Sequence, residues 1–88
     1  MSNIVQLITK HLPSGQIVSI DGHPATPETA DEVVQKWSAR QAQLGDRAED
    51  AVAILVKLPQ QDPPVPASLL RRVLLVDPVR NEVVGTSG

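Results

Sequence analysis

The apolar side chains of this sequence are almost all aliphatic, and this feature most narrows the folds that the chain can adopt. Val, Ile and Leu make up most of the 41% of residues that are hydrophobic, whereas there is one Trp and neither Phe nor Tyr. A core of β-branched side chains packs well on strands, so we expect a β-sheet. The 88 residues fit a single domain, residues 1–88, which buries about two-thirds of the surface of its unfolded chain.

The sequence contains no cysteine, which removes disulfides, thiolate nucleophiles and Cys-based metal sites from consideration. The opening residues lack the basic region and the long apolar region of a secretion signal. No window approaches the ~18 consecutive apolar residues of a membrane-spanning helix. We therefore expect a cytoplasmic protein with no membrane partner.

The net charge of −2 arises from 8 basic and 10 acidic residues that are unevenly distributed. Residues 27–50 carry most of the acids, whereas residues 51–88 are slightly basic. Nucleic-acid binding requires a strong positive field that replaces the counterions of the phosphates. The sequence has no such field, so a nucleic-acid partner is the least favoured class.

Residues 3–12 fit two structures. Their apolar residues recur at helical spacing, and Ser2 can cap a helix. Four of these residues are β-branched, however, and the turn residues 13–15 lead directly into a second β-rich run, residues 16–20. Two such runs joined by a short turn with glycine indicate a hairpin. We favour the hairpin, and the choice between strand and helix stays open.

A helix is predicted from Thr26 to Leu44. Thr26 can cap it, Pro27 suits its first position, and Gly45 suits the left-handed position after its last turn. Acids gather at its amino-terminal end, where the helix dipole favours negative charge: Glu28, Asp31 and Glu32. Its apolar residues lie at helical spacing: Ala30, Val33, Val34, Trp37 and Leu44.

The next segment is ambiguous as well. Asp46 and Glu49 have the spacing of a capping box, which favours a second helix over residues 47–53. Residues 51–58 are apolar at nearly every position and also fit a buried strand, since periodicity cannot separate the two. We lean towards a helix at first and an extended chain in the latter half, and leave residues 51–58 open between helix and strand.

The carboxyl-terminal part has clear turn chemistry. The Pro-rich residues 59–66 are expected to form a stiff connector without helix or strand. Residues 76–83 predict a hairpin, because Asp77, Pro78 and Asn81 stand where a tight turn needs them. Residues 85–88 are expected to form a flexible tail. The predicted fold class is α+β: a small antiparallel sheet from N- and C-terminal hairpins, packed against one or two helices.

Few residues suggest chemistry. Asp21 and His23 lie close together in a loop, where a carboxylate beside an imidazole can form a general base. No Ser or Cys nucleophile motif accompanies them, so a solvated turn is the simpler interpretation. The spacing of His11 and His23 matches no metal motif, and the glycines are isolated, unlike those of a phosphate-binding loop. We predict no catalytic residue, no metal ligand and no cofactor.

The candidate binding residues are an aromatic side chain and two charged groups. Trp37 is either the largest side chain of the core or an interface anchor. The acids Glu28, Asp31 and Glu32 complement the helix dipole or meet a basic partner, and the same choice applies to Asp46, Glu49 and Asp50. Three arginines converge into a basic patch if residues 70–76 pair with residues 82–86: Arg71, Arg72 and Arg80.

These features favour a small non-enzymatic protein that acts by binding a protein partner or by self-association. Strand edges can pair with another chain, and compact acidic proteins of this size are common as accessory, inhibitory or assembly proteins, including those of phages and plasmids. The first alternative is a small enzyme or small-molecule binder that uses Asp21, His23 and a nearby arginine. The second alternative is a regulator that binds nucleic acid.

Overall fold

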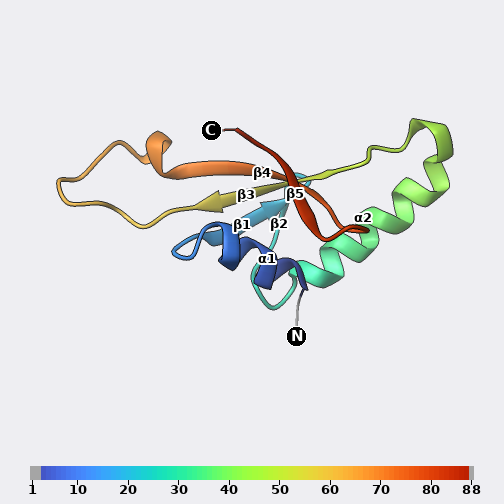
Figure 1. Ribbon diagram of the computed structural model, residues 1–88, viewed down its shortest axis with the longest axis horizontal. Helices are drawn as coiled ribbons and strands as arrows, with labels where there is room; N and C mark the ends of the chain where they lie inside the picture. The colour runs from blue at the N-terminus through green and yellow to red at the C-terminus, as the bar shows by residue number, and fades with distance from the viewer. Residues whose placement is uncertain (1–2, 88) are drawn as a thin grey trace.

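A five-stranded antiparallel sheet carries both helices on one of its faces in the computed structural model, which describes residues 3–87 (Figure 1). The strand order is β2-β1-β3-β4-β5. The α+β class, with hairpins at both ends of the chain and two helices against the sheet, is confirmed. The elements in chain order are α1 (Asn3–His11), β1 (Gln16–Ile20), β2 (His23–Pro24), α2 (Ala30–Leu44), η1 (Gly45–Arg47), β3 (Val52–Lys57), η2 (Ala67–Leu70), β4 (Arg71–Asp77) and β5 (Glu82–Ser87).

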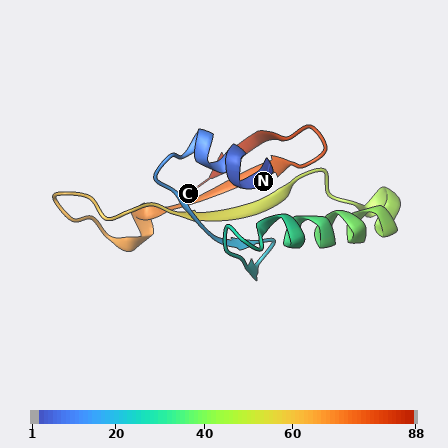
Figure 2. The same cartoon turned by 90° about the horizontal axis from the view of Figure 1, so that it is seen from below.

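The core lies between the helices and one face of the sheet. Figure 2 shows α1 over the β4–β5 side of the sheet and α2 on the β1–β2 side. Both helices contribute to one cluster of buried residues, which comprises Ile4, Ile8, Ile17, Ile20, Ala25, Ala30, Val34, Trp37, Val52, Ile54, Val56, Leu74 and Val76. The opposite face of the sheet carries no helix among the described residues, and its aliphatic side chains are only partly buried.

The central strand is β3, which pairs with β1 on one side and with β4 on the other. Its side chains alternate, so that Val52, Ile54 and Val56 are fully buried on the helix-covered face. The predicted helix over residues 47–53 is therefore wrong, and the extended latter half is correct. A short 3-10 turn, η1, follows α2 instead. Pairing on both edges and β-branched packing favour the strand.

The preferred strand interpretation of residues 3–12 is also wrong, because these residues form α1. In a strand, the face with Ile4 and Ile8 would also carry Gln6 and Lys10, two polar side chains. In the helix, Ile4 and Ile8 stand one turn apart and are buried, while Gln6 and Lys10 are exposed. Burial of a consistent apolar face thus overrides the strand preference of the β-branched residues.

The amino-terminal hairpin forms later in the chain than predicted, between β1 and β2 instead of between residues 3–12 and 16–20. Its two-residue turn is Asp21-Gly22, and both residues have positive φ, 52° and 77°. Asp-Gly is a favoured pair for such a turn, since a type I′ turn needs positive φ at both positions. The turn places His23 directly opposite Ile20.

Helix α2 begins at Ala30, four residues after the predicted cap. Thr26 and Thr29 close a turn before it: the Thr26 amide donates to Thr29 Oγ1 at 2.9 Å, and the Thr29 amide donates to the Thr26 carbonyl at 3.1 Å. The helix ends before Gly45, so the predicted stop is confirmed. The φ of Gly45 is positive at 58°, but its ψ of −120° lies outside the left-handed helical conformation that the sequence predicted for it.

The predicted carboxyl-terminal hairpin is present as β4 and β5. Asp77 Oδ1 accepts hydrogen bonds from the amides of Val79 at 3.0 Å and Arg80 at 3.2 Å, and Asn81 has a φ of 54°. Residues 85–87 are paired with β4 in β5 instead of forming a tail. A Cβ at Gly85 would lie 3.3 Å from Leu75 Cδ1, a close contact that a small shift of the Leu75 side chain would relieve. Residue 88 lies outside the described residues.

Residues 59–66 contain no helix or strand and form an arm between β3 and β4 (Figure 1). The Gln60 side chain holds the arm across its width: its Oε1 accepts from the Val65 amide at 2.8 Å, and its Nε2 donates to the Val65 carbonyl at 3.1 Å. The arm contributes to an elongated molecule of 47 × 26 × 21 Å.

The packing around Gly15 leaves no room for a side chain at this position. A Cβ at this position would lie 2.5 Å from Val56 Cγ1 and 3.2 Å from the Leu12 carbonyl oxygen. We therefore expect Gly15→Ala to lower the free energy of unfolding in urea by roughly 1–3 kcal/mol. Ser14→Ala, at the exposed neighbouring position, is the control and should change it by less than about 0.5 kcal/mol. Equal stability of the two variants would contradict this packing.

Candidate functional site

Trp37 lines two of the concave surfaces of the molecule. It projects from α2 into the core and is 5% exposed, so its predicted role as a core residue is confirmed. Its indole Nε1 is buried and has no hydrogen-bond partner among the described residues. An unpaired buried donor costs about 1–3 kcal/mol.

An open groove of about 620 Å³ lies on one side of Trp37. Three parts of the chain form its walls: the second half of α2, residues 49–51 before β3, and the β4–β5 turn with Val84. Gln41 joins the first two walls, because its Oε1 accepts a hydrogen bond from the Glu49 amide at 2.5 Å. The groove thus depends on tertiary contacts between segments that are far apart in the sequence.

The groove combines apolar surface with negative charge. Trp37, Ala51 and the half-exposed Val84 supply apolar lining, and Val79 at the turn is 93% exposed. The lining also contains three carboxylates and a single basic side chain: Glu49, Asp50, Asp77 and Arg80. Arg80 lies 3.9 Å from Asp77 and 3.6 Å from Glu82, so neighbouring acids already offset its charge. The groove is therefore net acidic.

The acids of residues 46–50 need an explanation other than the helix dipole. The predicted helix after Asp46 does not form: Asp46 lies in the three-residue η1, and Glu49 and Asp50 lie in the irregular connection that follows it. All three are exposed on the connection to β3, and two of them line the groove. The sequence left these acids open between a role at a helix end and contact with a basic partner, and the loss of the predicted helix removes most of the reason for the first role.

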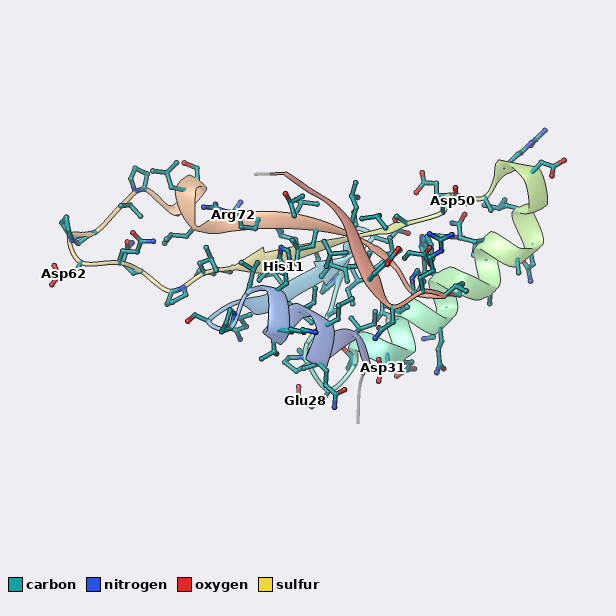
Figure 3. All side chains as sticks on the ribbon, viewed as in Figure 1. His11, Glu28, Asp31, Asp50, Asp62 and Arg72 are labelled. Atoms are coloured by element: carbon teal, nitrogen blue, oxygen red, sulfur yellow. The ribbon has the colours of Figure 1, made fainter. Side chains whose placement is uncertain are left out.

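The other acidic group lies at the far end of α2. Glu28, Asp31 and Glu32 are next to the amino-terminal end of a helix of 15 residues, which spans about 22 Å. Glu32 forms a surface ion pair with Lys36 at 3.4 Å. The six acids thus form two groups at opposite ends of α2 and share no single surface. Figure 3 shows Glu28 and Asp31 far from Asp50.

The predicted convergence of the three arginines is wrong. The strands pair as expected, but Arg71 and Arg72 begin β4 whereas Arg80 follows its end, about 20 Å away at ~3.4 Å per residue. Arg72 donates to the carbonyls of Leu69 at 2.9 Å and Arg71 at 2.8 Å. Figure 3 shows it at the arm side of the sheet. Of these arginines, only Arg80 lines the groove beside Trp37.

A second, smaller cleft of about 260 Å³ lies on another side of Trp37. The β1–β2 hairpin supplies Asp21 and His23, and α2 supplies Val33, Lys36, Trp37 and Arg40. The Asp21 carboxylate and the Arg40 guanidinium form an ion pair. The structure thus brings Asp21, His23 and an arginine together, as the alternative interpretation required. No serine or threonine hydroxyl lines this cleft.

Strand β5 is a free edge of the sheet. Its only charged residue is Glu82, and it contains no Lys or Pro, which commonly protect edges from pairing. The register shifts between β4 and β5 at Val84, which has no partner residue on β4. A bulge of this kind bends an edge strand and interrupts its ladder.

Within residues 3–87, no group of three or more His, Asp or Glu side chains is arranged to hold a metal ion. No helix among the described residues has the length and apolar character needed to cross a membrane. Comparisons with protein-family models, with curated proteins and with solved structures gave no match for this chain. Any function must therefore be argued from the groove, the cleft and the free edge themselves.

The burial of Trp37 makes a direct prediction about stability. Trp37→Ala should lower the free energy of unfolding by about 3–5 kcal/mol, because it leaves a large cavity in a small core. Trp37→Phe should cost less, since it keeps much of the volume and removes the unpaired N–H. Chemical denaturation followed by far-UV circular dichroism measures both. Gln43→Ala, at an exposed position of the same helix, is the control. A Trp37→Ala variant within about 1 kcal/mol of the parent would contradict the core role.

Proposed function

We propose that this chain is a non-enzymatic protein that binds a segment of a protein partner in the groove beside Trp37. The observation that supports the proposal is the combination of apolar lining and excess carboxylates in one open groove. Apolar surface favours association, while surrounding charge selects the partner and sets its orientation. As part of this proposal we keep the cytoplasmic location expected from the sequence.

The chemistry of the groove specifies the partner segment. Glu49, Asp50 and Asp77 favour lysine or arginine side chains, which are the groups that pair with carboxylates. Ala51 and Val84 favour an aliphatic or aromatic side chain between them. A basic segment with an apolar anchor meets both requirements.

We propose a different protein, rather than a second copy of this chain, as the partner. Self-association would use β5, the longer free edge of the sheet. The irregularity at Val84 leaves only residues 85–87 as a regular run beyond it, and such bulges are a usual protection against edge pairing.

The oligomeric state tests this choice. We expect size-exclusion chromatography with multi-angle light scattering to give the mass of one chain at micromolar concentration, because the β5 edge is irregular. A dimer that Thr86→Pro converts to a monomer would identify β5 pairing instead. Lys57→Ala, on the central strand away from this edge, is the matched surface control.

Selection from a random peptide library on the immobilised protein tests the groove. We expect enriched peptides that contain Lys or Arg beside an aliphatic or aromatic residue. The double variant Glu49→Gln/Asp50→Asn should bind them roughly tenfold more weakly, because it removes two attractive charges, each worth up to about 1 kcal/mol near the surface. The affinity of the parent should fall as salt is raised.

A matched variant distinguishes binding in the groove from a general effect of the negative charge of the protein. Glu28→Gln/Glu32→Gln removes the same charge at the other end of α2 and should leave peptide affinity unchanged. Selection of acidic peptides, or equal losses in the two double variants, would contradict binding in the groove.

A further inference from the structure

We infer that the cleft between the β1–β2 hairpin and α2 binds a small organic carboxylate. Four residues of α2 face it at the spacing i, i+3, i+4 and i+7, which is one face of a helix: Val33, Lys36, Trp37 and Arg40. Asp21 and His23 close the opposite side from the hairpin. This site is separate from the proposed protein-binding groove, although Trp37 lines both.

The charges of the cleft favour an anion. Lys36 and Arg40 are basic, whereas Asp21 is the only acid in its lining. The Asp21 carboxylate pairs with one nitrogen of Arg40, which leaves other guanidinium N–H groups to donate. The ion pair between Lys36 and Glu32 joins side chains that are 76% and 67% exposed. Such exposed pairs contribute little, so the Lys36 ammonium remains available to a ligand.

The walls of the cleft favour a ligand that carries an apolar group next to its negatively charged group. Val33 and Trp37 supply aliphatic and aromatic surface, and Trp37 is nine-tenths buried with an unpaired N–H. A volume of about 260 Å³ is smaller than the usual drug-sized pocket of ~300–1,000 Å³. The ligand is therefore a monocarboxylate with a short branched or cyclic hydrocarbon part, rather than inorganic phosphate.

The hairpin gives this cleft a fixed geometry. The positive φ values of Asp21 and Gly22 define a two-residue turn, and the register places His23 opposite Ile20, which is fully buried. The ion pair from Asp21 then fixes Arg40 across the cleft. The imidazole of His23 can donate a third hydrogen bond to the carboxylate. The cleft lining provides no hydroxyl nucleophile, so we assign binding without a reaction.

Trp37 provides the measurement, because the chain contains one Trp and no Tyr. We expect 3-methylbutanoate to change the tryptophan emission of the full chain in a saturable manner. The neutral amide 3-methylbutanamide and inorganic phosphate should each bind at least roughly tenfold more weakly, since each lacks either the charge or the apolar body. Equal binding of the amide or of phosphate, or no saturable change with 3-methylbutanoate, would overturn the inference.

Charge variants locate the site. Lys36→Gln and Arg40→Gln should each weaken 3-methylbutanoate roughly tenfold, which is the expected loss of one charged hydrogen bond. Lys57→Gln, an exposed lysine of β3 outside the cleft lining, should leave the affinity unchanged. Amide shifts in two-dimensional NMR should concentrate at residues 21–23 and 33–40. Unchanged affinity in Lys36→Gln, whose side chain is exposed and not needed for folding, would overturn the site.

The proposals for the carboxylate site and for the groove can be tested independently. The variant Glu49→Gln/Asp50→Asn should retain 3-methylbutanoate binding, because neither side chain lines the cleft. Lys36→Gln should retain peptide binding, because Lys36 does not line the groove. Loss of carboxylate binding in the groove variant would show that the small anion had been assigned to the wrong surface.

Discussion

The two-sided pairing of β3 is the interaction on which the rest of the structure depends. This strand carries backbone ladders to β1 and to β4, and its three inward side chains are fully buried beneath the helices. Because it reaches both hairpins, it joins the two ends of the chain into one sheet. Both helices pack on the aliphatic face of the sheet, and β3 lies at the centre of that face. A chain with so few aromatic residues gains its cohesion from this close packing of Val and Ile side chains.

Trp37 connects this core to the groove and to the cleft. It is the one large aromatic side chain, and its position on α2 lets it pack in the core while it lines both the groove and the cleft. The two surfaces differ in charge: carboxylates dominate the groove, whereas Lys36 and Arg40 lie in the cleft. Under the two proposals above, ligands of opposite charge bind on different sides of the same indole. Electrostatic selection of this kind operates through partner choice more than through raw affinity.

Local chemistry made some elements predictable and left others open. The Asp77 hairpin and the helix stop at Gly45 follow from turn residues whose backbone preferences are intrinsic, so the sequence indicated them directly. The segments that form α1 and β3 are short apolar runs, and their state depends on neighbours that only the folded sheet supplies. The candidate sites divide in the same way. Asp21 and His23 are neighbours in the sequence, whereas the approach of Arg40 to Asp21 and of Glu49 to Gln41 requires the tertiary fold.

The carboxyl-terminal half of α2 is the part of the fold that stability alone does not explain. Its buried residues end at Trp37, and Leu44 is 44% exposed, so the last two turns extend beyond the strands (Figure 2). Helical turns without an apolar face against the core add little to folding free energy, because most helix stability in proteins comes from packing. A shorter helix joined directly to β3 would bury the same core. Ser38 and Gln41, at the start of this overhang, line the groove opposite the β4–β5 turn, whereas residues 42–44 do not. Departures from the most economical fold are expected at functional surfaces, and the part of the overhang that lines the groove agrees with the binding proposed there.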